Sequence, residues 1–357
     1  PVEKGGASLV ILVPKADVVK EALTAQEFIL GAIGSHNARM RSIVLGVALI
    51  VLALAFILSK LFTRNISKLA TAVGLVAQGD FSARADIRDR DEIGRLGEAF
   101  NRMVPELKER ISIKNALEVA QQVQQNLLPS GSPQFHGNDI AATSEYCYET
   151  GGDYFDFIPR PGPHGESLVV AVGDVSDHGI PSALMMASAR AYIRSHAATC
   201  ERLDDVVKRV NELIADDSHQ TGRFMTLFLL ELAADGSVRW VRAGHDPALM
   251  YDPVADTFHE LAGGGFPLGI IRDTAYELNE RPALPPGQII VIGTDGIWET
   301  IAPDGAMFGK ERLREVIRAH RDESSTAIIQ AVVQALNTFR GPAARTDDMT
   351  VAVVKTP

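Results

Sequence analysis

An uncharged run of apolar residues, Ser42–Ser59, constrains the fold of this chain more than any other segment. As a helix rising about 1.5 Å per residue it is about 27 Å long, which matches the apolar core of a bilayer. Basic residues, among them Arg41 and Lys60, stand on both sides and can reach lipid head groups. The alternative is a buried helix of a soluble domain. We predict a transmembrane helix over residues 42–62.

The segment before this run reads as the end of another domain. Ala7–Val13 has the pattern of a buried strand that Pro14 ends, and Ala16–Ile33 has helical spacing. This order resembles the closing element of an extracytoplasmic Cache-type sensor. We therefore expect residues 1–41 to be its C-terminal remnant and, because the first residue is Pro1, expect further residues upstream.

Two apolar stripes of equal spacing follow the membrane run, and Gly79 is expected to end the first helix. Their members are Ile66, Leu69, Val73 and Val76, then Ile93, Leu96, Phe100 and Met103. Together with D-E-I-G-R-L at 91–96, the two stripes resemble a HAMP domain, expected over residues 63–111. Such helices cannot bury their stripes alone, so we predict a parallel homodimer. The alternative is an ordinary amphipathic hairpin.

A further helix is expected from Pro105 to Leu128. Its stripe is interrupted around Ile111–Ile113, where a change of seam would alter a supercoil locally. We assign residues 112–130 to a coiled-coil linker.

Beyond residue 138 strands and helices are mixed. The predicted strands are Ile140–Glu145, Tyr154–Ile158, Ser167–Gly173, Phe224–Leu232, Val238–Ala243, Ala248–Tyr251, Gln288–Gly293 and Met349–Lys355. The predicted helices are Pro181–Ala197, Leu203–Ser218, Glu311–His320 and Ser324–Thr338. Many strands with few, clustered helices indicate an α+β fold.

Four aspartates lie at the ends of apolar strands, each in a short turn. Their settings are G-G-D-Y-F-D at 151–156, G-D-V-S-D-H-G at 173–179, T-D-G at 294–296 and R-T-D-D-M-T at 345–350. A carboxylate beside glycine can approach a cation without crowding, and backbone groups can join it. Any one of them alone could be a turn or cap residue. Four together predict an oxygen-lined cation site.

These motifs, with A-G-H-D-P at 243–247, resemble in their order the PPM (type 2C-like) serine/threonine phosphatases, and specifically the bacterial SpoIIE/RsbU branch. The resemblance runs from about Leu117 to Val354 and implies a PPM-type αββα sandwich over residues 138–357. One departure is Asp177, where this branch usually carries glycine.

The resemblance also implies the roles of the site residues. Asp153 is the bridging metal ligand, with a carbonyl of Gly152 or Tyr154 beside it. Asp295 and Asp347 complete one metal, and Asp174 lies on the side of the second. Asp153 and Asp295 are the residues on which catalysis is expected to depend.

The expected cofactors are two divalent cations, Mn or Mg. Phosphomonoester hydrolysis needs a nucleophile and neutralised phosphate charge, and a pair of such ions can supply both. Hard cations bind carboxylates, carbonyls and water, which this chain offers, whereas it has neither H-E-x-x-H nor clustered cysteines. Cys147 and Cys200 are expected to be reduced core thiols. His178 and His245 are candidate general acids; alternatively His178 caps a turn and His245 supports its loop.

Together these features predict a phosphatase of phosphoserine or phosphothreonine on a protein, anchored in the cytoplasmic (inner) membrane with its phosphatase domain in the cytoplasm. The branch resemblance implies a STAS-type anti-sigma-factor antagonist as substrate. A net charge of −10 speaks against nucleic acid as a partner. The alternatives are a diguanylate cyclase, which G-G-D-Y-F-D superficially resembles, a histidine kinase, and an inactive signalling scaffold.

Overall fold

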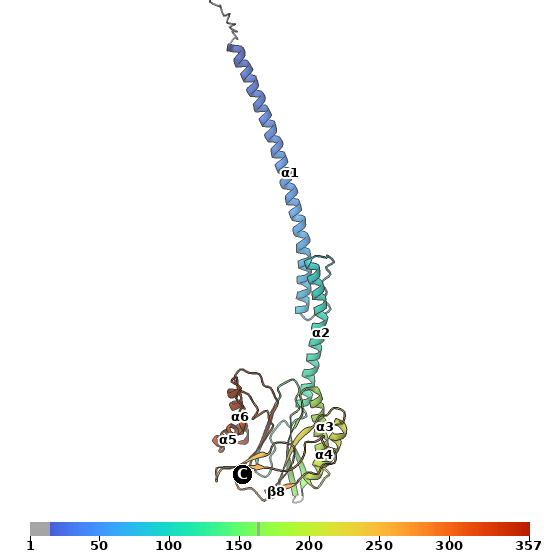
Figure 1. Cartoon of the computed structure of the whole chain (residues 1–357), viewed down its shortest axis with the longest axis vertical. Helices are drawn as coiled ribbons and strands as arrows, with labels where there is room; N and C mark the ends of the chain where they lie inside the picture. Colours follow the sequence, from blue (N-terminus) through green and yellow to red (C-terminus); the bar gives the residue numbers. More distant parts are fainter. Residues whose placement is uncertain (1–14, 163–164) are drawn as a thin grey trace, which may run out of the picture. The chain divides into compact units, whose positions relative to one another are not determined.

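The computed structural model describes residues 15–162 and 165–357, which form two compact units, Pro1–Ile111 and Ser112–Pro357 (Figure 1). The predicted strand Ala7–Val13 lies outside the described residues.

The described part of the first unit begins with one long helix, α1, over Lys15–Ala77. It joins the helix predicted from Ala16 to the apolar run without a break. An 18-residue window of α1 has a mean hydropathy of 2.8, and none of it is buried. By length and composition, α1 can cross a membrane.

Alternate residues of the connector after α1 are buried. Ala83 and Ala85 are buried, and Asn101 bonds both backbone groups of Ala85, accepting from its N–H at 2.8 Å and donating to its carbonyl at 3.0 Å. A small core of Ala72, Ala85, Phe100 and Val104 holds the two helices and the connector together.

The second predicted stripe is only partly buried within one copy. Phe100 is in the core, but Leu96 and Met103 remain 52% and 51% exposed, and Val104, outside the predicted stripe, is fully buried. One part of the stripe, Phe100, therefore packs within the chain, whereas Leu96 and Met103 remain exposed to solvent.

Helix α2 runs over Glu92–Gln125 and contains Pro105. It ends three residues before the predicted Leu128, in a turn in which Leu127 N–H bonds the Gln124 carbonyl. Leu128 packs against two apolar cores of the second unit.

The second unit contains two antiparallel five-stranded sheets. The first has the order β1-β10-β9-β6-β7 and the second the order β2-β3-β4-β5-β8. Their strands are β1 Asp139–Glu145, β2 Tyr154–Gly162, β3 Gly165–Val175, β4 Met225–Ala233, β5 Val238–Ala243, β6 Ala248–Asp252, β7 Thr257–Leu261, β8 Asn279–Arg281, β9 Ile289–Gly293 and β10 Met349–Lys355.

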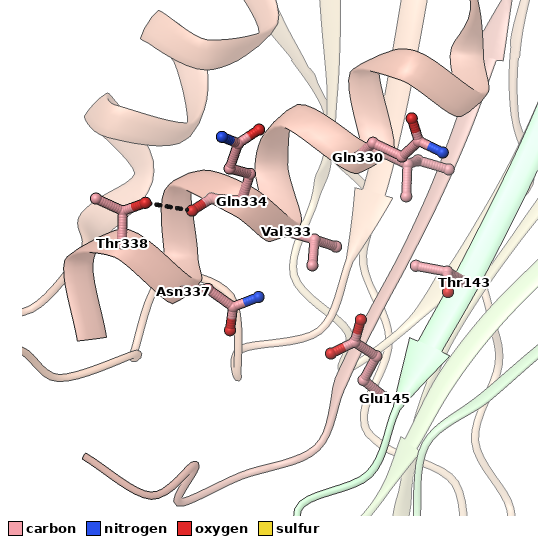
Figure 2. Close-up of a pocket in the computed structure, with 8 residues that line it drawn as sticks. Thr143, Glu145, Gln330, Val333, Gln334, Asn337 and Thr338 are labelled. Carbon is pink, nitrogen blue, oxygen red and sulfur yellow. Dashed lines mark hydrogen bonds between the residues drawn. The ribbon is translucent and has the colours of Figure 1, made fainter. Parts of the chain in front are cut away.

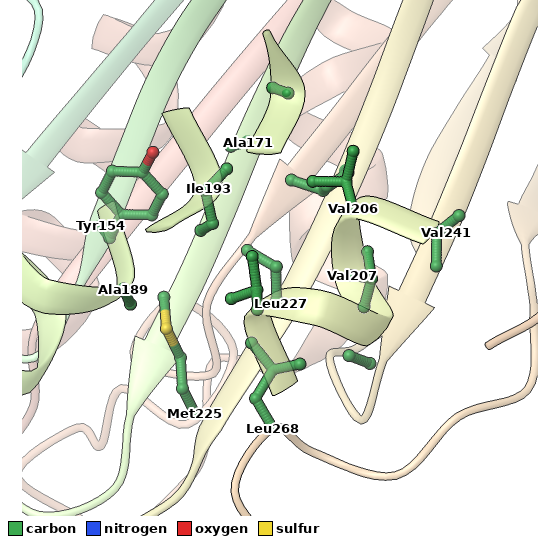
Figure 3. Packing of buried hydrophobic residues seen from close by; sticks show 14 of the residues in the cluster. Tyr154, Ala171, Ala189, Ile193, Val206, Val207, Met225, Leu227, Val241 and Leu268 are labelled. Atoms are coloured by element: carbon green, nitrogen blue, oxygen red, sulfur yellow. The ribbon is translucent and has the colours of Figure 1, made fainter. Parts of the chain in front are cut away.

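Two helix pairs cover the outer faces of these sheets (Figure 1). They are α3 Ile180–Ala197 with α4 Leu203–Ser218, and α5 Gly309–Ala319 with α6 Ser325–Arg340. Three apolar clusters fill the three interfaces between the four layers. Figure 3 shows the cluster between α3, α4 and their sheet, where Ile193 and Val206 meet Leu227 and Val241. The predicted α+β fold and αββα sandwich are confirmed.

All predicted strands and helices of this unit are present, but β7 and β8 were not predicted. Both lie at the edges of their sheets. β7 is largely exposed and β8 has three residues, all polar. An edge strand needs no continuous apolar pattern, because one side and often one face meet water.

Candidate active site

Two of the four predicted aspartates lie on neighbouring strands of one sheet. Tyr154, the first residue of β2, pairs with Gly173 of β3. The register continued by one residue puts Asp153 beside Asp174, and the charge of Asp174 raises the pKa of Asp153. The G-G-D and G-D-V-S motifs are therefore adjacent because their strands pair.

The other two aspartates belong to the second sheet. β9 ends at Gly293, which pairs with Val351 of β10. Asp295 lies two residues after the end of β9, and Asp347 two residues before the start of β10. These two loops therefore leave the sheet at the same end.

The two pairs of carboxylates meet between the sheets. Burial, together with the charges of Asp295, Asp347 and Asp348, raises the pKa of Asp174 to about 8. Burial also raises the pKa of Asp153 well above its usual value, with added repulsion from Asp174 and Asp348. For Asp295 and Asp347 burial is again the first cause of a raised pKa. Asp174 thus lies within electrostatic range of Asp295 and Asp347 and beside Asp153, so all four predicted aspartates lie in one region of the unit.

The donor chemistry of this cluster suits a hard divalent cation. Buried carboxylates that repel one another are stabilised when a cation lies between them. Within residues 15–162 and 165–357, no three acidic, histidine or cysteine side chains converge on one point as they stand. Mg²⁺ commonly uses one or two carboxylates and keeps several waters, so paired carboxylates are compatible with it.

Glycine is required where the loops of the site touch. A Cβ on Gly152 would lie 2.6 Å from the Val175 carbonyl oxygen. On Gly296 it would collide with the carbonyl of Asp348. The glycines of the G-G-D and T-D-G motifs therefore permit a backbone approach that brings the carboxylates together.

Asp348 holds the G-G-D loop in place. Its Oδ1 accepts from Cys147 N–H at 2.8 Å and its Oδ2 from Gly152 N–H at 2.9 Å, and the residue is 5% exposed. Both of its oxygens are engaged by backbone, so it shapes the loop that carries Asp153.

Two threonines that the sequence reading missed link the sheets beneath the site. Thr294 donates from its hydroxyl to Asp153 Oδ2 at 2.9 Å, and the same hydroxyl accepts from Thr350 N–H at 2.9 Å. Both residues are buried. Both threonines stand in motifs that the sequence analysis singled out, T-D-G and D-D-M-T. That position could have indicated a role in the site, but only the aspartates of these motifs were assigned one.

His245 supports its loop and is not placed as a general acid. It is buried, and burial lowers its pKa to about 4, so the ring is neutral near pH 7. Its Nε2 lies 3.1 Å from the Gly293 carbonyl and therefore carries the proton, while Nδ1 accepts from the Thr226 hydroxyl at 2.8 Å. The ring thereby joins β4 to the end of β9.

His178 does not cap the following helix. The N-cap of α3 is Gly179, with no side-chain hydrogen bond, whereas the His178 ring lies 4.5 Å from the exposed Tyr148 ring. The charge of His178 acts to lower the pKa of Asp347, so the ring is near the site.

Asp177 stands where the SpoIIE/RsbU branch usually carries glycine, and it adopts the left-handed backbone conformation that glycine favours. Its φ is 65°, in the left-handed region, which aspartate tolerates better than most residues. Its carboxylate is largely exposed and lies 3.6 Å from the Arg223 guanidinium. The turn is thus retained, and the extra negative charge of Asp177 is paired with Arg223.

Cys147 and Cys200 are free thiols, as predicted, but they are half-buried.

Among the hollows on the side of the unit that carries α6, two differ in their distance from the aspartates. One, of about 560 Å³ between α6 and β1, has Val333 and Asn337 facing Thr143 and Glu145 (Figure 2) and contains none of the four aspartates. The other, about 300 Å³, includes Asp347 in its wall. This second hollow adjoins the carboxylate cluster; its remaining lining includes Gly296, Ile301, Met307, Arg340 and Arg345.

Replacement of Asp153 by asparagine tests the repulsion directly. The folded pKa of Asp153 lies above its unfolded value, so at pH 7.5 ionisation of this carboxyl costs stability in the folded state, by about 1.4 kcal/mol per pKa unit. We expect Asp153→Asn to raise the Tm of the metal-free protein and to weaken Mn²⁺ binding at least about tenfold by calorimetry.

Asp156→Asn is the matched control for this substitution. Asp156, in the strand that directly follows Asp153, is equally buried, but Arg194 donates to both of its oxygens at 2.6 Å. Its replacement breaks a paired charge and is expected to lower Tm. A metal-free Asp153→Asn protein that melts earlier than wild type would contradict the assignment.

Asp348→Asn is expected to have a milder effect on Mn²⁺ binding than Asp153→Asn. Asparagine can accept only one of the two backbone bonds now made to Cys147 and Gly152, so hydrogen exchange should increase over residues 147–152. Loss of all Mn²⁺ binding would instead make Asp348 a direct ligand.

Comparisons with known proteins agree with this architecture. The family described as "Stage II sporulation protein E (SpoIIE)" matches residues 164–357, more than half of the chain, and the HAMP domain family matches residues 57–109. The "Phosphoserine phosphatase RsbU" of Bacillus subtilis (strain 168) is 29% identical over 225 residues, which are 63% of this chain and 65% of RsbU. "Protein IcfG" of Synechocystis sp. is 26% identical over 329 residues, 82% of this chain and 51% of IcfG. The chain thus spans less than two thirds of either relative.

Solved structures show the same fold. The SiaA-PP2C domain of Pseudomonas aeruginosa superposes with a TM-score of 0.60 at 22% identity, covering 70% of this chain and 99% of that domain. The phosphatase domain and regulatory fragment of SpoIIE from Bacillus subtilis gives a TM-score of 0.51 at 17% identity, covering 61% and 62%. The family predicted from the five motifs is confirmed. This chain belongs to the SpoIIE family, with a HAMP domain ahead of a C-terminal unit that has the PP2C fold.

Proposed function

We propose that this chain is a membrane-anchored, metal-dependent phosphatase that hydrolyses phosphoserine or phosphothreonine on a protein. The observation that carries the proposal is the meeting of Asp153, Asp174, Asp295 and Asp347 from four separate motifs. The name of the relative RsbU, a phosphoserine phosphatase, supports the substrate class.

The four aspartates would hold two divalent cations, Mn or Mg, with the carbonyl of Gly152 beside them. When bound, such ions supply a water of lowered pKa and neutralise charge on the phosphate. Thr294 orients Asp153 through its hydroxyl, and Asp348 fixes the Gly152 backbone. These contacts are made before any ligand arrives, so the loop that carries Asp153 is already held in place.

The departing serine or threonine oxygen must receive a proton. His245 is unsuited to donate this proton, because it is buried and its Nε2–H is hydrogen-bonded to the Gly293 carbonyl. His178 is exposed, near Asp347 and free of a capping role, which makes it the better candidate for a general acid.

The hollow beside Asp347 is suited to the protein segment that carries the phosphate. It combines the side chains of Ile301 and Met307, which are 45% and 52% exposed, with the stems of Arg340 and Arg345. An extended peptide offers both apolar and acidic groups to such a surface. We propose a STAS-type antagonist protein as the substrate, on the basis of the SpoIIE/RsbU family.

Anchoring and dimerisation follow from the first unit. An apolar helix followed by a HAMP domain is the arrangement of a membrane-anchored signalling protein, and we place the C-terminal unit in the cytoplasm. Leu96 and Met103, exposed in one copy, would be covered by a second parallel copy. Residues 1–41, 42–62, 63–111 and 112–130 are then sensor remnant, membrane helix, HAMP and linker.

Hydrolysis by the full chain in detergent tests the proposal. With Mn²⁺, we expect release of phosphate from p-nitrophenyl phosphate and from a phosphoserine protein, loss of activity in EDTA, and no activity in Asp295→Ala. Asp273→Ala, an exposed aspartate whose contact is an ion pair with Arg272, is the matched control and should retain activity.

Other outcomes would identify the alternatives. A folded chain that binds Mn²⁺ but hydrolyses neither substrate would be a signalling scaffold. Formation of a cyclic dinucleotide from GTP would indicate a cyclase, and transfer of phosphate from ATP to the chain would indicate a kinase. The SpoIIE family match favours the phosphatase over both.

A further inference from the structure

Helix α6 and strand β1 are held together at one end and leave a groove at the other. Ser325, the first residue of α6, donates from its N–H to Asp139 Oδ2 at 2.6 Å and from its hydroxyl to the Asp139 carbonyl at 2.7 Å. Asp139 is the first residue of β1. The last residue of β1, Glu145, pairs with Met349, two residues after Asp347. The helix and the strand are therefore joined far from the aspartates, and the groove lies toward them.

This groove is the hollow of about 560 Å³ between the two elements (Figure 2). Thr143 and Glu145 of β1 line one side, and the lining from α6 includes Gln330, Gln334 and Asn337. β1 is the outer strand of its sheet, and no described strand pairs with its other edge. The sheet therefore does not close the groove on that side.

The lining suits an extended polypeptide better than an ion. A carboxamide both donates and accepts hydrogen bonds, as a peptide group does. The carboxamides of Gln330 and Gln334 are exposed and bond no other residue in the described part of the chain. Glu145 is the one charged residue of this lining, and it is paired with Arg345. The groove thus offers uncharged donors and acceptors that match a peptide backbone.

Two arginines connect the groove with the hollow beside Asp347, and both line that hollow. Arg345 donates to Glu145, to Oε2 at 2.5 Å and to the backbone carbonyl at 3.2 Å. Arg340 donates to Asn337 Oδ1 at 3.0 Å. Since Glu145 and Asn337 line the groove, the two spaces share a partition. A polypeptide that occupies the hollow can therefore continue into the groove.

We propose that the groove between α6 and β1 is a docking site for an extended segment of the phosphoprotein substrate, whose backbone groups bond the carboxamides of Gln330 and Gln334. The inference rests on the proposed function, in which the hollow beside Asp347 receives the substrate. Because these carboxamides read backbone, the groove should favour a longer substrate segment over a particular sequence.

Two synthetic phosphoserine peptides test this inference. They share one central sequence and have about 5 and about 15 residues, and an extended chain spans about 3.3 Å per residue, so the longer one reaches further from the phosphate. With the full chain in detergent and Mn²⁺, we expect kcat/KM to be about tenfold higher for the longer peptide, mainly through a lower KM. p-Nitrophenyl phosphate, which has no such segment, is the third substrate.

Replacement of both Gln330 and Gln334 by alanine removes the two carboxamides from exposed positions, where alanine favours the helix. We expect kcat/KM for the longer peptide to fall to the value for the shorter one, with hydrolysis of p-nitrophenyl phosphate unchanged. Gln330→Trp is the second variant, because a large ring in the groove should exclude the segment and give the same result.

Glu315→Ala is the matched control. Glu315 is exposed on α5 and lines a separate hollow between α5 and α6, to which Gln334 also contributes. If the effect belongs to the groove and not to that hollow, Glu315→Ala keeps the tenfold preference for the longer peptide. Loss of the preference in this control would overturn the assignment to the groove.

The other outcomes separate this inference from the proposed function. Equal kcat/KM for the two peptides in wild type, or a preference that persists in Gln330→Trp, would overturn the docking site and leave the phosphatase proposal intact. An equal loss on p-nitrophenyl phosphate would show that the variants act on the site itself, and a lower oligomeric state by sedimentation would make a second copy the occupant. If wild type hydrolyses none of the three substrates, both the inference and the proposed function fail.

Discussion

Repulsion between buried carboxylates is the constraint on which the rest of the C-terminal unit depends. Asp153 and Asp174 lie beside each other where the sandwich excludes water, and burial together with neighbouring charges raises the pKa of both. A fold that served stability alone would avoid this arrangement. It persists because the surrounding backbone is fixed by other contacts, and because a cation can lie among the oxygens.

Each of those contacts joins segments that are far apart in the sequence. Thr294 connects Asp153 to the second sheet, Asp348 connects residues 147 and 152, and His245 joins β4 to β9. The two sheets are thereby linked at the end where the aspartates lie. Gln124 of α2 adds a further link, through its hydrogen bonds to both backbone groups of Gly151.

Much of this architecture could be predicted from the sequence. The bounds of β5 and β10 were predicted to the residue, since an apolar strand between turn residues is a local signal. β7 and β8 were missed because polar edge strands have no such signal. The second apolar stripe of the HAMP domain was predicted as a single buried face, but Leu96 and Met103 are exposed and Val104 is buried. Spacing shows which residues share a helix face, but it does not show which neighbour covers each of them.

Within the candidate site, the residues that could be predicted from the sequence were those whose side chains are typical metal ligands. Four aspartates in glycine-containing turns stood out, whereas Thr294 and Gln124 did not. A threonine or glutamine has many ordinary positions, and its role depends on a partner that only the fold supplies. His178 was expected to be a cap or an acid, and only the structure showed that Gly179 occupies the cap.

Anomalous diffraction from crystals of the chain grown with Mn²⁺ tests the central claim most directly. We predict two peaks within coordination distance of Asp153, Asp174, Asp295 and Asp347, and none in the hollow between α6 and β1. An ordered site without manganese among these carboxylates would contradict it. Peaks bound only to other acidic residues, such as Glu145, would contradict it as well.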